Sequence, residues 1–557
     1  MKYSRVTEAF EELEETQKNL EKTSILAKLF QESEDELEEV VLLTTGTPFP
    51  AWKNMDLGVS SKTLVKIISK ATGRTEDEVE QAWKEKGDLG LAAEKMVEKK
   101  TQQRLFTGEL TVEKVVDRLE KVAEMEASGI SQSVDQDKKQ KELAELISSA
   151  EPREARYTAR IIINNLRLGV GEGTIRDALA EAFFDGEHAE DIQKAYDFTN
   201  DFGEVAEACK EGLESVEELE LVLGRPIKSM LAKKVETIEE GFEEVGKPAA
   251  IDYKYDGMRA QIHVVDGDVT VFTRRLENVT EQFPDAVKAV EENINADNCI
   301  IDTELVGYDP EDGGMIPFQK LSKRIKRKYE IQKLKKEIPV EVRPFDLIYL
   351  DEPILERPYS KRWKKLEEIV EEEKESVRLA DHRETSNEEE VSEMQQQSLS
   401  DGHEGIMMKS LESEYRPGNR VGYMVKLKPV METLDLAIVG AKWSEGRRSD
   451  WLGRLFLGCY DEEKDEYKEV GKMATGLTDE QFQEITGKLK PLITEEDGRK
   501  VEVRPEIIVE AEYEEIQKSP NYSSGYALRF PRMKRFREDK EQADTLQRIK
   551  KLYQDQS

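Results

Sequence analysis

The hexapeptide Lys-Tyr-Asp-Gly-Met-Arg at residues 254–259 is the part of the chain best suited to covalent chemistry. Apolar, strand-like runs flank it, so Lys254 is expected at a strand end, where the Asp-Gly pair turns the chain. A lysine amine is a nucleophile only when it is deprotonated, and burial or nearby cations such as Arg259 lower the pKa of a lysine. The pattern predicts a nucleophilic lysine in a cleft. The alternative is a hairpin turn with a surface lysine.

Other short motifs rich in charged residues follow along the chain. They are Phe-Thr-Arg-Arg at 272–275, Asp-Thr-Glu at 302–304, Arg-Pro-Phe-Asp at 343–346, Glu-Gly-Ile-Met-Met-Lys at 404–409, Lys-Leu-Lys at 426–428 and Arg-Glu-Asp-Lys at 537–540. In this order they resemble the motif set of the covalent nucleotidyltransferases, which include ATP-dependent ligases, NAD-dependent ligases and mRNA capping enzymes. The chain is most similar to the replicative-type ATP-dependent DNA ligases of archaea and eukaryotes, over nearly its whole length.

The resemblance implies that the protein seals nicks in duplex DNA in three steps, with ATP and Mg²⁺ as cofactors. Lys254 takes AMP from ATP and releases pyrophosphate, AMP passes to the 5′-phosphate of the nick, and the 3′-hydroxyl displaces AMP. Each step is an in-line displacement at phosphorus, which depends on alignment and on neutralising spread negative charge. Such chemistry explains why lysine and arginine are frequent in the motifs.

The resemblance also implies roles for individual residues. The implied nucleotide-binding residues are Asp252 for recognition of adenine, Phe345 for stacking on it, Arg259, Arg274 and Arg420 for ribose or phosphate, and Lys426 and Lys428 for the α-phosphate. Glu304 and Glu404 are expected to bind ribose hydroxyls or Mg²⁺, with ribose favoured for Glu304 and the metal for Glu404. Asp252 stands where replicative ligases usually have glutamate, which leaves the base specificity open.

The expected fold is multi-domain. Apolar residues at helical spacing in 110–127 and 139–147 predict an all-helical, DNA-binding domain over residues 1–222. Strands alternate with helices over 223–429, where we predict an α+β nucleotidyltransferase (adenylation) domain with helices at 284–293 and 360–376. Short β-rich runs separated by glycine turns, such as 507–516, predict a β-barrel OB-fold domain over 430–557.

The net charge is −35, from 119 acidic and 84 basic residues, which is extreme for a protein expected to bind a polyanion. One interpretation is that the chain does not bind nucleic acid. The other is a halophilic archaeon with molar salt in its cytoplasm, where the screening length falls to about 3 Å and acidic surfaces favour solubility. The motifs favour the second interpretation.

Two segments have a pattern that suits DNA phosphates. The glycine-rich residues 167–174 run into a helix, which directs backbone amides at an anion; an ordinary glycine loop is the alternative. A basic run comprises Lys320, Lys323, Arg324, Lys326, Arg327 and Lys328, for which a solvated helix face is the alternative. In so acidic a chain, we favour a DNA contact for the basic run.

Partners and location are indicated by weaker signals. Gln103, Leu105 and Phe106 lie in a segment that resembles the sliding-clamp-binding segment of archaeal ligases, although a loop with two buried apolar residues fits equally well. A run of 18 apolar residues and a signal peptide are both absent from the sequence, so we expect a cytoplasmic, nucleoid-associated monomer without membrane contact. The three cysteines share no metal spacing and are expected to pack in cores. His263 is a weak candidate to face the nucleotide.

Three other functions compete with DNA ligation. RNA ligases and capping guanylyltransferases share the motifs but lack a long helical N-terminal domain. A non-catalytic DNA-binding scaffold would not need Lys254, Glu304, Glu404, Lys426 and Lys428. A P-loop ATPase is not favoured, because the chain has no Gly-Lys-Ser/Thr phosphate loop.

Overall fold

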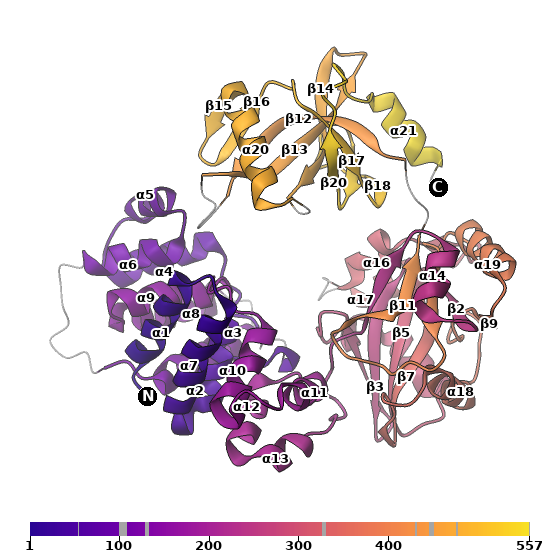
Figure 1. The fold of residues 1–557 in the computed structure, drawn as a ribbon, viewed down its shortest axis with the longest axis horizontal. Coiled ribbons are helices and arrows are strands. Elements are labelled where there is room, and N and C mark those ends of the chain that lie inside the picture. The colour runs from indigo at the N-terminus through magenta and orange to yellow at the C-terminus, as the bar shows by residue number, and fades with distance from the viewer. Residues whose placement is uncertain are drawn as a thin grey trace. The chain divides into compact units, whose positions relative to one another are not determined.

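The computed structural model describes residues 1–53, 55–99, 109–127, 133–325, 330–428, 432–444, 450–474 and 477–555. The chain divides into two compact units, Met1–Val79 with Ala93–Pro429, and Glu80–Ala92 with Val430–Ser557. A helical region precedes a sheet-containing central region, and a strand-rich region ends the chain (Figure 1). The predicted domain boundary at residues 429–430, the clamp segment and Lys326 to Lys328 lie outside the described residues.

The N-terminal region is helical, as predicted. Its helices are α1 (Tyr3–Glu15), α2 (Asn19–Glu32), α3 (Leu37–Thr45), α4 (Ser61–Thr72), α5 (Glu76–Lys86), α6 (Leu89–Glu98), α7 (Val112–Ala127), α8 (Ser133–Ser149), α9 (Pro152–Ile162), α10 (Glu172–Phe184), α11 (Ala189–Thr199), α12 (Phe202–Glu211) and α13 (Leu213–Glu217). In α7 the buried residues Val112, Val115, Val116 and Leu119 recur every three or four positions, which is the pattern of a helix with one apolar face.

The central region alternates strands and helices. The elements are β1 (Leu231–Val235), α14 (Ile238–Val245), β2 (Ala249–Tyr253), β3 (Met258–Val265), β4 (Asp268–Thr273), α15 (Pro284–Asn293), β5 (Asn298–Tyr308), β6 (Met315–Ile316), α16 (Phe318–Ile325), α17 (Ile331–Glu337), β7 (Val340–Leu350), β8 (Glu352–Pro353), α18 (Tyr359–Ile369), β9 (His382–Thr385), α19 (Glu388–Ser400), β10 (Ile406–Ser410) and β11 (Arg420–Leu427). Sheet A has the order β1-β11-β10-β2-β9, and sheet B has the order β4-β3-β5-β7-β8, with β6 paired to β5.

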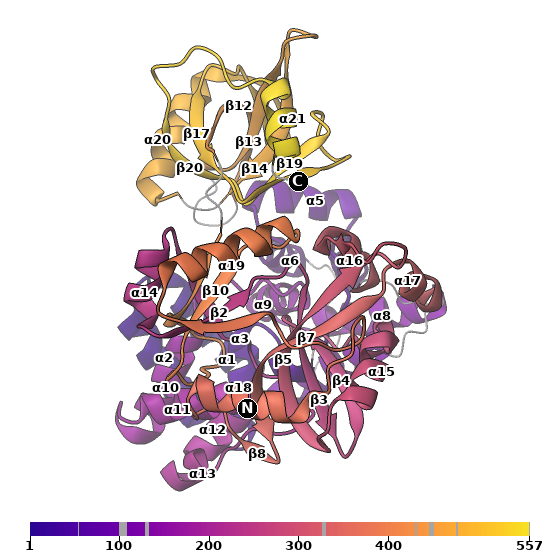
Figure 2. The same ribbon diagram turned by 90° about the vertical axis from the view of Figure 1, so that its right-hand side faces the viewer.

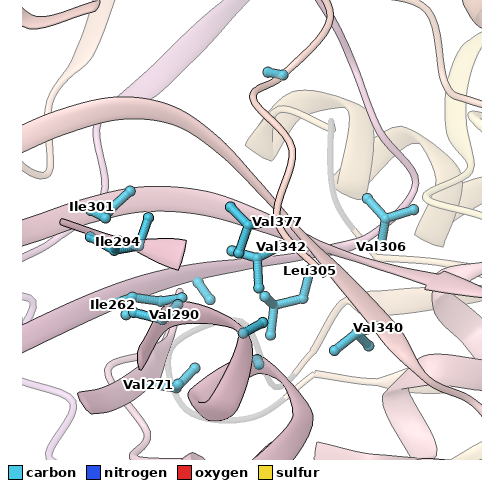
Figure 3. Close-up of a cluster of buried hydrophobic side chains, with 14 of the residues drawn as sticks. Ile262, Val271, Val290, Ile294, Ile301, Leu305, Val306, Val340, Val342 and Val377 are labelled. Carbon is cyan, nitrogen blue, oxygen red and sulfur yellow. The ribbon is translucent and has the colours of Figure 1, made fainter. Parts of the chain in front are cut away.

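Each sheet has one face covered by helices. On sheet A, Phe242 of α14 and Val391 of α19 pack against apolar residues of β2, β10 and β11, and Figure 2 shows both helices at this sheet. On sheet B, Val290 of α15 belongs to a core that includes Ile262 of β3 and Ile301 of β5; Figure 3 shows part of this core. Burial of apolar area is the main stabilising term for both layers.

The predicted helices of this region are right at one place and partly wrong at another. The helix predicted at 284–293 is α15. The helix predicted at 360–376 ends at Ile369, as α18, because the next residue, Val370, is extended and forms a β-bridge with Ile294. The acidic residues after it offer no apolar face that could continue the helix.

The C-terminal region is rich in strands. Its elements are β12 (Leu434–Trp443), β13 (Leu452–Asp461), β14 (Glu466–Met473), α20 (Asp479–Leu489), β15 (Ile493–Asp497), β16 (Lys500–Val503), β17 (Ile508–Glu512), β18 (Glu515–Lys518), β19 (Tyr526–Arg529), β20 (Arg532–Phe536) and α21 (Leu546–Asp555). β12 lies between β13 and β16 and also pairs with β17. The run predicted at 507–516 forms two strands rather than one, because β17 pairs with β12 and β20 whereas β18 pairs with β19.

Candidate active site

The polar residues named above come from the faces of sheets A and B that the helices leave uncovered. Side chains alternate along a strand, so on β2 Ile251 points to the helix-covered core while Asp252 points to the other face. On β3, Met258, Ala260 and Ile262 enter the core of sheet B, which leaves Arg259 on the opposite face. The turn between β2 and β3 joins the two sheets, so residues 254–259 connect the two polar faces.

Lys254 directly follows β2, as predicted, and is aligned with the 404–409 motif by backbone hydrogen bonds. The Lys254 amide donates to Gly405 O at 2.8 Å, and the Glu404 amide donates to Lys254 O at 2.8 Å. Gly405 has a φ of +127°, and a β-carbon there would collide with the Leu427 carbonyl of β11. Glycine at this position therefore allows the backbone before β10 to approach the end of β11 beside Lys254.

Three charged side chains meet at this point. The Lys254 ammonium and the Glu404 carboxylate form an ion pair, and Lys428 Nζ lies 2.8 Å from the same carboxylate. Burial alone would raise the pKa of Glu404, but Lys254 and Lys428 outweigh it and lower this pKa to about 2. Glu404 is therefore an anion at neutral pH that holds two cations from the ends of β2 and β11.

Glu304, on β5, lies near the same charged groups, but its pKa is shifted in the opposite direction. Burial raises the pKa of Glu304 to about 8, although Lys254 and Arg259 act to lower it. Gly257 makes this placement possible, because a β-carbon there would lie 2.6 Å from Leu305 O and 2.7 Å from the Glu304 side chain. A carboxyl group with this pKa is mostly protonated at neutral pH.

Arg259 is held by a partner that the motifs did not indicate. Its Nε and Nη2 atoms donate to the two carboxylate oxygens of Asp302, at 3.0 and 2.6 Å, and Tyr415 donates to Asp302 at 2.7 Å. Asp302 is completely buried. The bidentate pair is the geometry in which guanidinium and carboxylate bind most strongly. Asp302 belongs to the 302–304 motif, but its partners are distant in sequence.

Asp252 is likewise paired rather than open to solvent. Its carboxylate is 1 % exposed and lies 2.5 Å from Lys409 Nζ and 2.7 Å from His382 Nδ1. Burial acts to raise the pKa of Asp252, but Lys409 and His382 reverse this and the pKa is lowered. Sequence reasoning missed both partners. Lys409 could have been found, since it ends the 404–409 motif and its alternation with Met408 on β10 places it on the polar face.

Phe345 is half-buried beside two cations. Lys409 Nζ lies 5.0 Å from the centre of the Phe345 ring, and the Arg259 guanidinium lies 5.3 Å from it. Cations at these distances are attracted by the negative face of an aromatic ring. Phe345 therefore belongs to the same cluster as Asp252 and Arg259, with residues from both sheets.

The remaining predicted residues lie at the rim. Arg274 follows β4, and its pKa is lowered by burial and by the nearby Arg259 and Arg420 guanidinium groups. Arg420 begins β11 and donates to Ala232 O at 3.1 Å. Lys426 lies opposite Met407 in the β10–β11 register, two residues before Lys428. The structure thus gathers all the predicted residues of 252–428 into one region.

Two other predicted contacts have structural partners. Arg324, from the basic run, is 1 % exposed and pairs with Asp285, so it packs inside the fold instead of presenting its charge to DNA. In the 537–540 motif, Arg537 donates to Asp435 at 2.8 Å and to Asp539, and Lys540 pairs with Asp435. Both cations of that motif are thus engaged within the C-terminal region.

The described residues carry neither a cluster of metal ligands nor a membrane-spanning helix. Among the described residues, no group of three or more His, Cys, Asp or Glu side chains is placed so that it could hold a metal ion. Within the same residues, the helices are too short or too polar to cross a membrane. The three cysteines are buried and unbridged, as expected for residues packed in cores.

The sequence matches family models along most of its length. Residues 2–180 match "DNA ligase N terminus", residues 229–428 match "ATP dependent DNA ligase domain" and residues 448–540 match "ATP dependent DNA ligase C terminal region". A DNA ligase of Nanoarchaeum equitans is 42 % identical over 565 residues, spanning 100 % of this chain and 98 % of the relative. A DNA ligase of Thermococcus fumicolans is 43 % identical over 560 residues, spanning 99 % and 98 %.

A solved structure named "Pmar-Lig_PreS3" has a similar fold, with a TM-score of 0.61 over 96 % of this chain and 99 % of that one, at 17 % identity. Residues 229–428, which carry the two-sheet site, match a ligase domain, so the class of protein is a nucleotidyltransferase. The chain belongs to the ATP-dependent DNA ligase family.

Proposed function

We propose that Lys254 is the nucleophile that takes AMP from ATP, and that the enzyme then seals nicks in duplex DNA. The observation that carries this proposal is the position of the Lys254 amine beside Glu404 and Lys428, where sheets A and B meet. Such a site offers an anionic substrate several cations in fixed positions, which is what phosphoryl transfer requires.

In the first step, the Lys254 nitrogen forms a bond to the α-phosphorus while the bond from that phosphorus to the pyrophosphate oxygen breaks. The Lys254 ammonium gives one proton to solvent before it attacks, and the attacking amine gives a second proton to solvent as the phosphoramidate forms. Lys426 and Lys428 would bind the α-phosphate, because Lys426 near the end of β11 lies on the polar face and Lys428, just after the strand, lies beside Glu404. Arg274 and Arg420, at the rim, would bind ribose or the outer phosphates.

Mg²⁺ fits this site as a partner of ATP. This cation is usually held by one or two carboxylates together with substrate phosphates. Glu404, which is anionic, suits the metal. Glu304 is mostly protonated and suits a hydrogen bond with a ribose hydroxyl, although approach of a cation would favour its ionised form and make it a second ligand. Bound Mg²⁺ would neutralise phosphate charge as pyrophosphate leaves.

The adenine would stack on Phe345. Asp252, which is buried and paired with Lys409 and His382, would act on the base by holding Lys409 at the Phe345 ring instead of by direct contact. The Arg259 guanidinium is paired with Asp302 and would form the wall of the pocket on the side of sheet B. Asp252 and Arg259 thus remain part of the nucleotide site, but each acts through a protein partner rather than by direct contact with the nucleotide.

We extend the proposal to the chain as a whole. Residues 1–222 would bind duplex DNA, 223–429 would carry adenylation, and 430–557 would form an OB-fold whose 537–540 motif, with Asp539 and Lys540, orients pyrophosphate. The net charge of −35 supports function at molar salt, and we keep the halophilic archaeal origin as a hypothesis. A monomer in the cytoplasm, with a clamp contact through Gln103, Leu105 and Phe106, completes the proposal.

The test is sealing of a singly nicked, labelled duplex with ATP and Mg²⁺ from low to molar KCl, with Lys254→Ala beside the wild type. Sealing by the wild type alone supports the proposal, and a KCl optimum near molar supports the halophilic origin. Loss of sealing above about 0.2 M KCl would contradict that origin, since ordinary charge-driven DNA binding weakens steeply with salt. Absence of both sealing and an AMP adduct would contradict the nucleophile assignment.

A further inference from the structure

The stretch from Gly224 to Met230, here called the connecting segment, leads from the helical region to β1 and lies along the polar face of β3. The Gly224 amide donates to His263 Nδ1 at 3.0 Å. Gln261 accepts from the Ile227 amide at 2.9 Å and donates to the Ile227 carbonyl at 3.4 Å. His263 and Gln261, which are two residues apart on β3, therefore bind Gly224 and Ile227, which are three residues apart in the connecting segment.

The same row of β3 side chains continues to the candidate active site. Arg259, two residues before Gln261 on β3, donates from Nη1 to Met230 O at 2.7 Å while its other nitrogens bind Asp302. The Met230 amide in turn donates to Tyr415, whose hydroxyl donates to Asp302. One end of the connecting segment is thus tied to the arginine that borders the nucleotide pocket.

His263 holds its place as a neutral ring. It is completely buried, and burial lowers its pKa to about 3. Because Nδ1 accepts from Gly224, the proton is on Nε2, which donates to Gln261 Oε1 at 2.9 Å. The hypothesis that His263 faces the nucleotide is wrong: its ring is committed to the connecting segment and to Gln261.

The opposite side of the connecting segment reaches the helical region. Arg225 pairs with Glu204 of α12, and its guanidinium lies 4.5 Å from the centre of the Trp52 ring. Lys228 pairs with Glu172 of α10 and donates to the Tyr196 hydroxyl at 2.7 Å. The segment therefore presents 224, 227 and 230 to β3, and 225 and 228 to the helices.

We propose that Gln261 and His263 are positioning residues for nick sealing, which align the helical region with the nucleotide site by fixing the connecting segment on β3. This inference rests on the proposed function, in which the helical region binds DNA. Transfer of AMP to Lys254 needs ATP and Mg²⁺ but no DNA, whereas the later steps need the nick placed within reach of Lys254. The two residues therefore matter for sealing and not for adenylation.

The main test is Gln261→Ala, measured in two assays. Adenylation of Lys254 by labelled ATP without DNA is expected to stay within about twofold of wild type, because Gln261 touches none of the residues around the lysine amine. Sealing of a nicked duplex by pre-adenylated enzyme in a single turnover is expected to fall about tenfold or more, because two backbone groups of Ile227 and His263 Nε2 lose their buried partner. Unchanged sealing, or an equal fall in both assays, overturns the proposal.

His263 provides a conservative pair of variants that separates positioning from simple loss of stability. His263→Asn retains an oxygen acceptor for the Gly224 amide, whereas His263→Leu fills the space without one. The asparagine variant is expected to seal at least about threefold faster than the leucine variant at matched thermal stability. Equal sealing by the two variants would contradict a role for the hydrogen bond.

A charge swap tests the opposite side of the segment without touching the core. Lys228→Glu is expected to reduce sealing about threefold by repelling Glu172, and the double variant Lys228→Glu with Glu172→Lys is expected to restore it. Failure of the double variant to recover would overturn the link to α10. If wild-type protein itself forms no AMP adduct, the proposed function fails; if it seals and Gln261→Ala seals equally, only this inference fails.

Discussion

Glu404 and Glu304 lie close to the same lysine, but the two sheets give them opposite protonation states. Before β10 of sheet A, Glu404 receives two ammonium groups directly, and its pKa falls to about 2. On β5 of sheet B, burial dominates for Glu304 and its pKa rises to about 8: Lys254 and Arg259 act to lower it, but the Glu404 and Asp302 carboxylates add to the rise. A buried carboxyl group is therefore ionised when cations contact it directly, and cations that lie only nearby do not outweigh its burial.

Glu404 and Glu304 therefore suit different chemical roles. A permanent anion can hold Lys254 in place and suits a divalent cation, whereas a neutral carboxyl group can donate a hydrogen bond to a hydroxyl. Glu404, beside sheet A, would then hold the cations of the reaction, and Glu304, on sheet B, would orient the nucleotide by a hydrogen bond. Replacing each glutamate by glutamine, which keeps the shape of the side chain, should therefore have unequal effects.

The largest effect is expected at the lysine itself. Lys254→Arg keeps the positive charge beside Glu404 but cannot form the phosphoramidate, because a guanidinium stays protonated. Formation of the AMP adduct should fall by about 10³-fold or more, with the melting temperature close to wild type. Intact-protein mass spectrometry after incubation with ATP checks this. An adduct formed at the wild-type rate would show that another residue is the nucleophile.

Glu404→Gln is expected to have the next largest effect. It removes the anion that pairs with Lys254 and Lys428, so adenylation should slow by about 10²-fold, comparable to the loss of one electrostatic group in other active sites. The rate of adduct formation at saturating ATP and Mg²⁺ provides the measurement. A change of less than about threefold would show that Glu404 has no special role in sheet A.

Glu304→Gln should be milder, because a group that is mostly protonated at neutral pH loses little when its proton site becomes an amide. We expect adenylation at pH 7 within about tenfold of wild type. A loss as large as that of Glu404→Gln, measured in the same assay, would show that Glu304 acts as an anion and would remove the difference between the two sheets.

The pH dependence of stability separates the two carboxyl groups further. Glu304 has a raised pKa in the folded state, so its contribution to the free energy of unfolding declines as pH rises from about 4.5 to about 8, by up to about 1.4 kcal/mol per pH unit. Glu404 has a lowered pKa, so its contribution is lost as pH falls from about 4.5 to about 2. Urea unfolding between pH 5 and 8 should show a steeper decline in wild type than in Glu304→Gln, in which other buried acids with a raised pKa, such as Asp197, remain. Equal slopes in the two proteins would contradict the raised pKa of Glu304.

The smallest effect is expected from Asp302→Asn. This change weakens the hold on Arg259, and a freed guanidinium would lower the pKa of Glu304. The variant should therefore show a flatter decline of stability above pH 5 than wild type does, in addition to some loss of overall stability. A slope identical to that of wild type would show that the Arg259–Asp302 pair does not control Glu304.

Local patterns in the sequence were sufficient for the elements and for several site residues, but not for the partners of those residues. Alternation around Leu427 placed Lys426 and Lys428 on one face, and the Asp-Gly turn placed Lys254 at a strand end. The pairing of Asp252 with His382 depends on β2 lying beside β9, which no local pattern encodes. The same holds for Gln261, whose partner Ile227 is not on a neighbouring strand but in the connecting segment.

The boundaries of elements were predicted less well than their types. The helix predicted at 360–376 stops at Ile369, because the acidic residues that follow offer no apolar face and Val370 forms a β-bridge with Ile294. Arg324 looked like part of a DNA-facing basic run, yet its pairing with Asp285 turns it inward. In each case a long-range contact overrides a local preference.

The most direct test of the central claim is to map the AMP adduct and its rate of formation side by side in wild type, Glu304→Gln and Glu404→Gln. We predict AMP on Lys254 in all three, with a rate within about tenfold of wild type in Glu304→Gln and about 10²-fold slower in Glu404→Gln. An adduct on a residue other than Lys254, or equal rates in the two glutamine variants, would contradict the account.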